Sequence, residues 1–239
     1  MSEQHLQQPE LLVNPGKNEL IEVDGKTYRR LCLRTHLLLQ GEDLNEVVKH
    51  YAAPHLQKGD ILFITEKAVA ATQGRAIPLA DIKPSRLARF LTKFVYKRPG
   101  DAGRARPETM EMAIRECGRL RILFAAFVAG IGRLLGKRGW FYNIAGDKAR
   151  SIDGPADYAL PPFDNCVVLG PKDPNKVAKE LAKTLGCQVV VTDINDLGGK
   201  VLGKSDAKID EELIPRILRD NPLGQGSQQT PMGIIRVVS

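Results

Sequence analysis

The clearest hydrophobic pattern in the chain is a pair of short apolar runs, ILFIT at residues 61–65 and QVVVT at residues 188–192. Runs of this length that are rich in β-branched residues predict strands buried on both faces. The second run stops at Asp193, and Asn195, Asp196 and two glycines follow it. Polar side chains at a strand end can bind a ligand or a divalent cation, or they can form an Asx turn that only closes the strand.

Further strand patterns occur elsewhere in the chain. Residues 21–35 contain Asp24-Gly25, a pair typical of a tight hairpin between two strands. The segment WFYNIA at residues 140–145 predicts a strand that runs into Gly146 and Asp147, a second place where a strand ends in glycine and an acid. Two more strands are predicted at residues 165–171 and 232–238.

Apolar residues at helical spacing predict helices over six segments. They are residues 41–53, 85–96, 107–118, 122–135, 173–186 and 210–221, the last interrupted by Pro215. The most apolar of them, residues 122–135, contains Arg133 and is shorter than the roughly 20 apolar residues that span a bilayer. We therefore expect it to be a helix buried in the core.

The N-terminal residues 1–19 are polar and contain Pro9 and Pro15, so they are predicted to be a flexible tail. The remaining residues 20–239 have enough apolar side chains for a globular domain. The four cysteines have no CxxC spacing, which argues against a zinc ribbon and a disulfide framework and favours a reducing cytoplasm. No signal-peptide pattern is present, and no membrane partner is expected.

The formal net charge of +7 suggests an anionic partner, such as nucleic acid, a membrane surface or a phosphorylated small molecule. The densest basic cluster lies at residues 97–106, between prolines and glycines, and aromatic residues make up only 5% of the chain. Stacking on single-stranded bases therefore has little support. A basic RNA-associated protein stays an alternative, and it would bind with an affinity that falls steeply with salt.

Two segments have a composition that suits close contact with a ligand. Residues 66–75 are rich in small side chains and reach Gly74, so their backbone could approach a ligand or simply pack tightly. Gly224 and Gly226 flank Gln225 and could offer free backbone N–H groups to a phosphate. No Walker A, GxGxxG, GxSxG or HExxH motif occurs, and His50 and His55 are expected to be surface residues.

The order and spacing of four pieces resemble the coenzyme F-420 gamma-glutamyl ligase family. The pieces are GDILFITEKAVAATQGR followed by PSRLA, GWFYNIAGDKARSIDGP with LPPFD, VVVTDINDLGG, and GQGSQQTPMGIIR. The resemblance covers residues 30–239 and implies an α+β fold, with mixed β-sheets and flanking helices, in a homodimer. It gives one ligase-like domain at residues 20–239, with a segment near residues 96–139 that is atypical of the family.

The resemblance implies a nucleotide-dependent ligase that joins L-glutamate to a carboxylate, the deazaflavin coenzyme F-420 precursor or a similar compound. The carboxylate would be activated as an acyl phosphate by GTP, with ATP as a possible substitute, and Mg or Mn would neutralise the phosphate oxygens. The implied metal ligands are Asp147, Asp193 and Gln225. The implied nucleotide-binding residues are Thr35, His36, Leu37, Glu66, Lys67, Arg150, Gly224, Gln225, Gly226, Ser227 and Gln228.

The chain departs from the family pattern at several of these positions. Ala71 replaces a lysine, Gln225 replaces a glutamate, Ile194 replaces a threonine and Arg150 replaces an asparagine. The loss of a phosphate-facing lysine and of a carboxylate leaves a second interpretation open, namely a non-catalytic ligand-binding paralogue. The identity of the carboxylate substrate is likewise left open.

Overall fold

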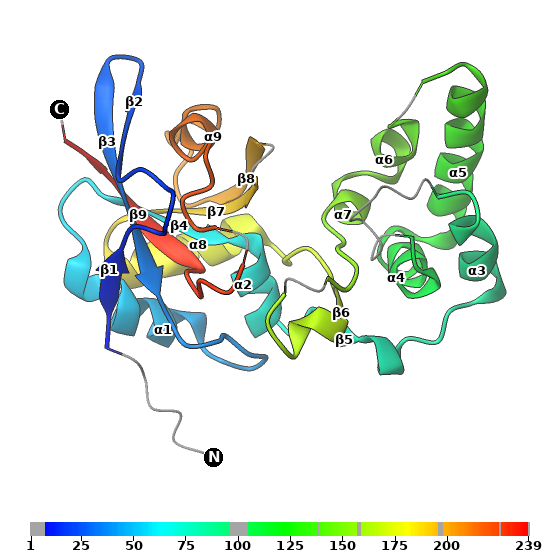
Figure 1. Ribbon diagram of the computed structural model, residues 1–239, viewed down its shortest axis with the longest axis horizontal. Helices are drawn as coiled ribbons and strands as arrows, with labels where there is room; N and C mark the ends of the chain where they lie inside the picture. The colour runs from blue at the N-terminus through cyan, green and yellow to red at the C-terminus, as the bar shows by residue number, and fades with distance from the viewer. Residues whose placement is uncertain are drawn as a thin grey trace. The chain divides into compact units, whose positions relative to one another are not determined.

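The computed structural model describes residues 8–95, 105–137, 139–156, 159–195, 198–224 and 226–238. The chain divides into two compact units, a sheet unit of residues 1–74 and 171–239 and a helical unit of residues 75–170 (Figure 1). Each unit is described by itself. The α+β class with a mixed β-sheet is confirmed.

The described part of the sheet unit has one mixed sheet of seven strands, in the order β1-β3-β9-β4-β7-β8, with β2 also paired to β3. The strands are β1 (Glu10–Leu12), β2 (Leu20–Val23), β3 (Lys26–Arg34), β4 (Ile61–Thr65), β7 (Gln188–Asn195), β8 (Gly198–Lys204) and β9 (Met232–Val237). The central strands β4 and β7 are parallel, whereas the other pairs are antiparallel. The two apolar runs of the sequence are thus neighbouring strands in the middle of the sheet.

The hairpin predicted at Asp24-Gly25 joins β2 to β3. Val23 pairs with Lys26, which leaves a two-residue loop, and both loop residues have positive φ, 53° and 73°. Aspartate and glycine tolerate this backbone conformation, which is the one that a tight turn between twisted strands requires.

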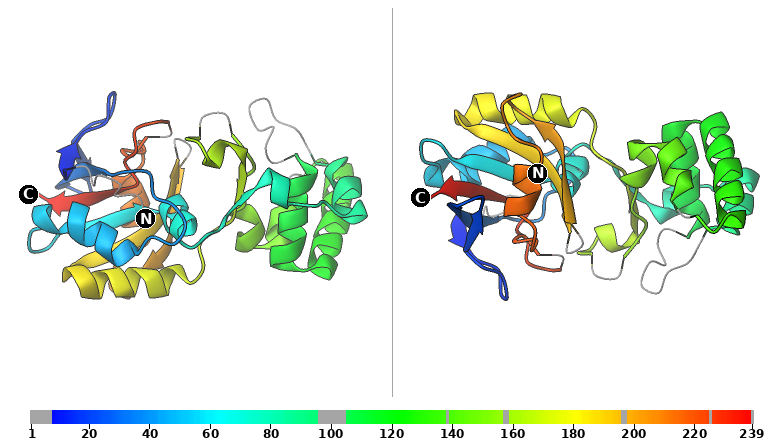
Figure 2. Two further views of the ribbon diagram at one scale, coloured as in Figure 1. Left: turned by 90° about the horizontal axis from the view of Figure 1, so that it is seen from below. Right: turned by 90° about the horizontal axis from the view of Figure 1, so that it is seen from above.

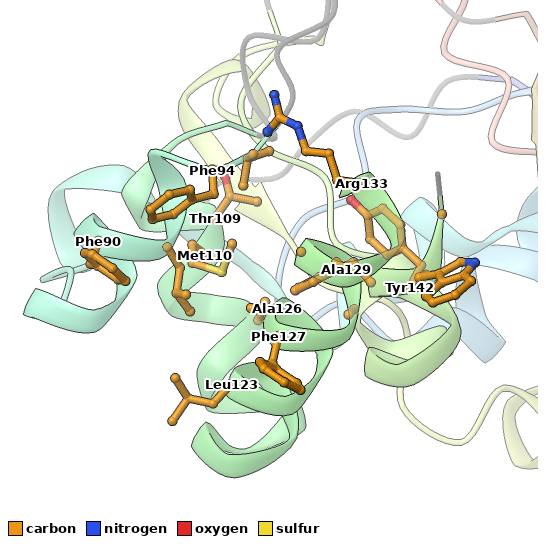
Figure 3. A pocket seen from close by; sticks show the side chains of 18 of the residues that line it. Phe90, Phe94, Thr109, Met110, Leu123, Ala126, Phe127, Ala129, Arg133 and Tyr142 are labelled. Carbon is orange, nitrogen blue, oxygen red and sulfur yellow. The ribbon is translucent and has the colours of Figure 1, made fainter. Parts of the chain in front are cut away.

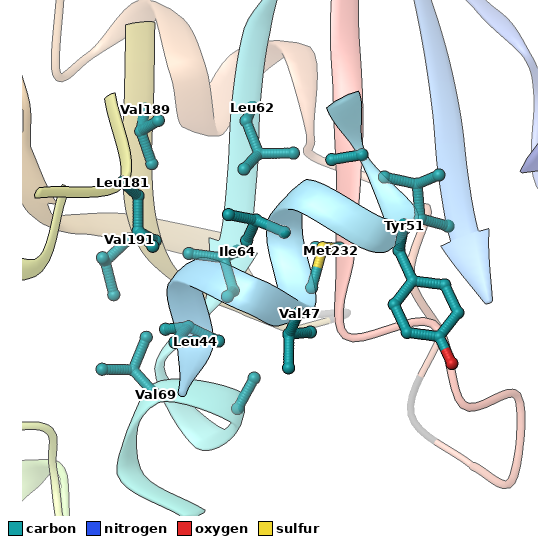
Figure 4. Close-up of a cluster of buried hydrophobic side chains, with 14 of the residues drawn as sticks. Leu44, Val47, Tyr51, Leu62, Ile64, Val69, Leu181, Val189, Val191 and Met232 are labelled. Carbon is teal, nitrogen blue, oxygen red and sulfur yellow. The ribbon is translucent and has the colours of Figure 1, made fainter. Parts of the chain in front are cut away.

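Both faces of the central strands are buried, as their unbroken apolar sequence predicts. One face packs under α1 (Leu44–Tyr51), α2 (Glu66–Thr72) and α8 (Pro174–Leu185), with Leu62, Ile64 and Val191 in the cluster (Figure 4). The alternate residues Phe63 and Val190 point to the other face, where α9 (Leu213–Ile217) packs. The views in Figure 2 show α8 lying along the sheet.

The segment predicted to be a flexible tail contributes to this sheet. Residues 10–12 form β1 and pair with residues 32–34 of β3. Asn14 is buried, and its amide donates to the carbonyl of Pro222 at 2.8 Å and to Thr230 Oγ1 at 3.0 Å. The polar composition of the segment did not reveal these interactions, because a polar side chain can also be buried when it finds hydrogen-bond partners. Residues 1–7 lie outside the described part.

In its described residues, the helical unit packs five α-helices around one core and has a two-stranded sheet beside them. Its elements are β5 (Ala76–Pro78), α3 (Arg86–Thr92), α4 (Pro107–Cys117), α5 (Arg119–Leu134), α6 (Trp140–Ala145), α7 (Asp147–Arg150) and β6 (Cys166–Val168). Ser85 caps α3 by accepting from the N–H of Ala88 at 3.2 Å, and Pro107 begins α4 as predicted. The predicted loop at 98–106 lies mostly outside the described residues.

The strand predicted at residues 140–145 is wrong, because these residues form helix α6. Trp140 packs directly on the backbone of α5: a Cβ added to Gly132 would lie 2.9 Å from the indole ring. Ala145 is buried in the helical core. Aromatic and β-branched residues favour strands on average, but here packing against a neighbouring helix outweighs that preference.

The expectation that residues 122–135 are buried is also wrong in large part. Only Ile122, Ala125 and Gly132 of α5 are buried. Leu120 is 83% exposed and Leu134 is 88% exposed. Among the described residues, no helix combines the length and the apolar character needed to cross a bilayer.

We expect Gly203→Ala to lower the free energy of unfolding by about 2 kcal/mol, because the added methyl group overpacks a rigid contact. Gly203 lies on β8, and a Cβ there would sit 2.3 Å from the carbonyl carbon of Pro174, at the start of α8. The matched control is Gly130→Ala on α5, where an added Cβ meets nothing within 4 Å. That change should stabilise the helix by up to about 1 kcal/mol. Urea denaturation of both variants checks the contrast.

Candidate functional site

Three strands of the sheet unit end at one edge, where a fourth begins. Leu33 of β3 and Ile64 of β4 both pair with Met232, the first residue of β9, and Thr65 of β4 lies opposite Thr192 of β7. The segment after β4 therefore lies beside β7, and the segment after β3 lies at the same end of the sheet, with β9 and β4 between it and β7. In α/β proteins, ligands commonly bind at the carboxyl ends of parallel strands. We call this place the ligand edge.

Most residues that the resemblance assigns to nucleotide binding come from segments that begin or end at the ligand edge. They are Thr35, His36 and Leu37 after β3, Glu66 and Lys67 at the start of α2, and Gly224, Gly226, Ser227 and Gln228 in the loop that leads into β9. Gln225 lies outside the described residues. The structure thus brings together segments that are almost 200 residues apart in the sequence.

The segment after β3 is held by a network of hydrogen bonds. Thr35 is fully buried, and its backbone N–H donates to the carbonyl of Gln229 at 3.0 Å. The imidazole of His36 lies between two partners: Nδ1 is 2.9 Å from the hydroxyl of Tyr51, and Nε2 is 2.5 Å from Glu42 Oε2. A side chain fixed at both ring nitrogens is oriented before any ligand arrives. Sequence reasoning missed Glu42 and Tyr51 in this role.

The segment after β4, for which we considered both ligand contact and tight packing, forms the helix α2. Thr65 caps α2 by accepting from the N–H of Ala68 at 3.2 Å, and its own N–H donates to Pro231 at 2.9 Å. Glu66 is buried, and Lys67 Nζ lies 3.3 Å from Glu66 Oε1. The small residues of this segment pack α2 against the core, so tight packing explains their composition. Lys67 stays half-exposed and presents a positive charge near the ligand edge.

Asp193 lies within a strand, not after one. The strand β7 continues to Asn195 and returns through β8, with Asp193 opposite Lys200. Gly199 leaves room for this hairpin, because a Cβ there would lie 2.1 Å from Cδ1 of Ile194. The Asx turn weighed as an alternative at Asp193 is therefore absent, since residues 193–195 have strand pairing. Asp196 lies outside the described residues.

The loop before β9 is internally bonded, which corrects the expectation of free amides at its two glycines. Gly224 has φ of 74° and donates to the carbonyl of Asn221 at 3.0 Å. The N–H of Gly226 donates to Gln228 Oε1 at 2.7 Å. The side chain of Gln228 folds back over the loop. Gly224 makes room for it, because a Cβ at Gly224 would lie 2.7 Å from the Gln228 side chain. A phosphate would have to displace Gln228 to reach the amide of Gly226.

Asp147 and Arg150 belong to the helical unit. Asp147 is the first residue of α7 and Arg150 the last, and both are exposed. Gly146 precedes them with φ of 87°, and an added Cβ there would lie 3.1 Å from the guanidinium of Arg121. Asp147 thus follows a helix and a turn, not the end of a strand.

The donor set for a divalent cation is incomplete in the described residues. No group of three or more His, Cys, Asp or Glu side chains lies close enough together there to hold a metal ion. Asp193 offers hard carboxylate oxygens, which suit Mg or Mn chemically. The proposed ligand Gln225 is outside the described part. The described residues therefore do not by themselves build the metal site that the resemblance implies.

Cysteine chemistry is not available at this edge. All four cysteines are unpaired thiols, which agrees with the absence of a predicted disulfide framework. Burial raises the pKa of the Cys32 thiol to about 12, so this group stays protonated at neutral pH. A protonated, buried thiol is a poor nucleophile.

The helical unit has a large cavity of its own that no sequence pattern predicted. Its volume is about 840 Å³, within the range of small-molecule sites. Its lining is mostly apolar, with Phe90 from α3, Met110 from α4 and Phe127 from α5 (Figure 3). Arg133 and Lys137 also line it. The exposed rings of Phe90 and Phe127 make the cavity continuous with apolar surface.

A mixed sheet with helices on both faces, and loops at the carboxyl ends of its parallel strands, defines an α+β protein. The family can be stated more closely. The model of the F420-0:gamma-glutamyl ligase family matches residues 32–207, and the chain belongs to this family. The match includes the segments of Thr35, Glu66, Asp147 and Asp193 and stops before the loop at residues 224–228. No curated protein matches the chain.

Proposed function

We propose that the protein is a nucleotide-dependent ligase that forms an amide bond between a carboxylate and L-glutamate. Family membership supports a ligase, and the ligand edge supports a nucleotide site in the sheet unit. The observation that carries the proposal is that the segments after β3 and β4, the loop before β9 and Asp193 all meet at that edge. The deazaflavin coenzyme F-420 precursor is the proposed carboxylate, and the proposed nucleotide is GTP.

The reaction proceeds in two steps in this proposal. A carboxylate oxygen of the acceptor attacks the γ-phosphorus of the nucleotide. The bond from that phosphorus to the β-γ bridging oxygen breaks, which releases the nucleoside diphosphate. The amine of glutamate then attacks the acyl carbon, inorganic phosphate leaves, and the nitrogen loses a proton. Mg or Mn would supply positive charge at the phosphate oxygens when bound. The chain's own residues position the nucleotide through Lys67 and the His36 segment.

An assay of purified protein tests this proposal directly. The protein is incubated with GTP or ATP, Mn, L-glutamate and the deazaflavin precursor, and the product is followed by mass spectrometry and phosphate release. We expect a product that has gained one glutamyl residue and a release of phosphate that depends on both carboxylate and glutamate. Binding of nucleotide without phosphate release would instead favour the second candidate, a non-catalytic paralogue. Ala71, which is buried on α2 and uncharged, favours that candidate.

We expect Lys67→Ala to weaken GTP binding about tenfold, because a hydrogen bond to a charged group contributes about 1.5 to 3 kcal/mol and this side chain is half-exposed. Isothermal titration calorimetry measures the change. The matched control is Lys58→Ala, since Lys58 is exposed in the turn before β4, at the other end of the same strand. An equal loss in both variants would show that only the net charge of the protein matters.

Two properties complete the proposal. We propose that the protein works in the cytoplasm, which agrees with four unpaired thiols, and that it is a homodimer as the resemblance implies. Sedimentation equilibrium at several protein concentrations checks the dimer. A monomer at all concentrations would remove that part of the proposal without affecting the ligase assay.

A further inference from the structure

Helix α5 has the sequence of a buried helix, yet one of its sides is open. Leu120, Phe124, Phe127, Ile131 and Leu134 follow one another at spacings of four and three residues, so they share one side of the helix. Each of these five residues is at least 40% exposed, whereas Ile122 and Ala125 on the opposite side are buried. A helix that is apolar all round is normally covered on every side. We call the five exposed residues the α5 stripe.

The α5 stripe is long and belongs to a larger apolar surface. At 1.5 Å per residue it extends about 21 Å along the helix. Phe90 and Phe94 of α3 are also more than half exposed, and they line the cavity together with Phe127. Leu120 and Leu134, at the two ends of the stripe, do not line the cavity. A small molecule in the cavity would therefore leave most of the stripe uncovered, so the occupant must be more extended.

The charge around the stripe is strongly positive. Residues 75–170 contain 17 Lys and Arg against 9 Asp and Glu, a net charge of +8, so the rest of the chain is close to neutral. Residues 117–146 contain five basic residues and no acid. Arg119 and Arg133, at the two ends of α5, are exposed and form no ion pair within the part of the chain that the structure describes. Arg119 lies beside the stripe at its N-terminal end, whereas Arg133 comes eleven residues after Ile122 and so lies on the opposite side of α5. The stripe is thus an apolar surface on a unit whose net charge is strongly positive.

A second copy of the chain fits this surface poorly. If the stripes of two copies packed together, each copy would bring a segment, residues 117–146, that has five basic residues and no acid to pair with those of its partner. Like charges that face each other at an interface are destabilising.

We propose that the α5 stripe binds the surface of an anionic lipid bilayer, with its leucines and phenylalanines among the acyl chains and the neighbouring Arg119 at the lipid phosphates. Aromatic and leucine side chains flanked by Lys and Arg are typical of helices that lie in the bilayer interface. Binding at the surface requires no spanning helix. The proposal concerns residues outside the ligand edge and is independent of ligase activity.

Flotation with lipid vesicles tests the proposal. The full chain is mixed with vesicles of phosphatidylcholine alone or with about one third phosphatidylglycerol at low salt. We expect binding to the anionic vesicles only, weakened by added salt because the electrostatic part is screened. Arg119→Glu should lower the partition coefficient about 30-fold, since each unit of charge near an anionic surface contributes about fivefold and this reversal changes the charge by two units. Leu120→Gln with Phe124→Gln should lower it by about tenfold or more for each side chain.

Matched controls separate the stripe from general properties of the chain. Leu20→Gln on β2 removes a comparably exposed apolar side chain from the sheet unit, and Lys179→Glu reverses an exposed charge on α8. Both variants should bind like the wild type. Circular dichroism and the melting temperature show that every variant is folded. Because the chain has a single tryptophan, Phe124→Trp in a Trp140→Phe background gives a reporter on the stripe, which lipids brominated in the acyl chain should quench.

Three results would overturn the proposal. One is the absence of binding to anionic vesicles at low salt. Another is binding that the stripe variants and the control variants weaken equally. The third is a wild-type dimer that Leu120→Gln with Phe124→Gln converts to a monomer, which would make the stripe an interface between copies of this chain.

Discussion

Replacement of Asp220 by alanine is expected to lower the free energy of unfolding by about 3 kcal/mol, the lower end of the cost of breaking a buried ion pair. The guanidinium of Arg30 on β3 is fully buried and donates to both oxygens of Asp220 and to the carbonyl of Ile217, at the end of α9. Without the carboxylate, this charge stays buried beside neutral carbonyl groups alone. We expect the lower end of this range of costs because the Asp220 side chain is 34% exposed. Urea denaturation measures the change.

The exposed pair of Arg216 and Asp24 provides the matched control. Its geometry is similar, since two guanidinium nitrogens donate to the two carboxylate oxygens, but both side chains are more than half exposed. Arg216→Ala breaks this pair without disturbing the positive φ of Asp24, and it should therefore change stability little. Equal effects of Arg216→Ala and Asp220→Ala would contradict the view that burial of Arg30 makes its pair important.

The same pair predicts how stability depends on pH. Burial acts to raise the pKa of Asp220, but the hydrogen bonds and charge of Arg30 outweigh it and hold the pKa below its usual value. The stabilisation is present above the unfolded pKa of about 3.9 and is lost as the pH falls through the lower folded pKa. Between pH 5 and 2 the wild type should lose more stability than Asp220→Ala.

Asp193→Asn is expected to reduce ligase turnover about a hundredfold or more, because in the proposed function this carboxylate would hold the divalent cation that neutralises the phosphate oxygens, and loss of such charge stabilisation has an effect of this size. Asparagine keeps the shape of the side chain and its place in β7, so the fold should be unchanged. Phosphate release in the presence of GTP, Mn, glutamate and carboxylate measures turnover. Binding of Mn, followed by calorimetry, tests separately whether this carboxylate contributes to a cation site.

Asp206→Asn is the control for this change. Asp206 comes just after β8, at the end of that strand which is farther from Asp193. Its carboxylate accepts a hydrogen bond from the N–H of Lys208 at 2.9 Å. Asparagine can accept the same hydrogen bond, so both stability and turnover should be preserved. If Asp193→Asn retained full turnover as well, Asp193 would have no part in the reaction.

Much of the sheet unit could be predicted from the sequence because its signals are local and agree with one another. The runs ILFIT and QVVVT are almost entirely apolar. Successive residues are buried on opposite faces of the sheet, such as Phe63 on one face and Ile64 on the other. Asp24-Gly25 requires positive φ at both positions, and the structure has it. Leu44, Val47, Val48 and Tyr51 recur at helical spacing, and all four are buried.

The errors occurred where tertiary contacts decide the structure. Residues 140–145 have strand composition but form a helix, because Trp140 fills the space above Gly132. The strand β7 extends to Asn195 because it pairs with β8. The glycine-rich sequence of β8 does not predict a strand. The side of α5 that faces outward could not be predicted, since both of its sides are apolar.

The candidate site was predicted in its segments but not in its internal bonds. The segments at residues 35–37, 66–67 and 224–228 were identified by resemblance, and their meeting at one edge follows from the order of the strands. The occupation of the Gly226 amide by Gln228 depends on a side-chain conformation that sequence does not specify. The same is true of the contacts that hold His36.

Hydrogen–deuterium exchange with and without GTP and Mn tests the central claim, that the ligand edge of the sheet unit is the nucleotide site. The predicted result is slower exchange in peptides that contain Thr35 to Leu37, Glu66 and Lys67, Asp193, and Gly226 to Gln228, and it should weaken in Lys67→Ala. If GTP binds and these peptides exchange at unchanged rates while others are protected, the ligand edge is not where the nucleotide binds.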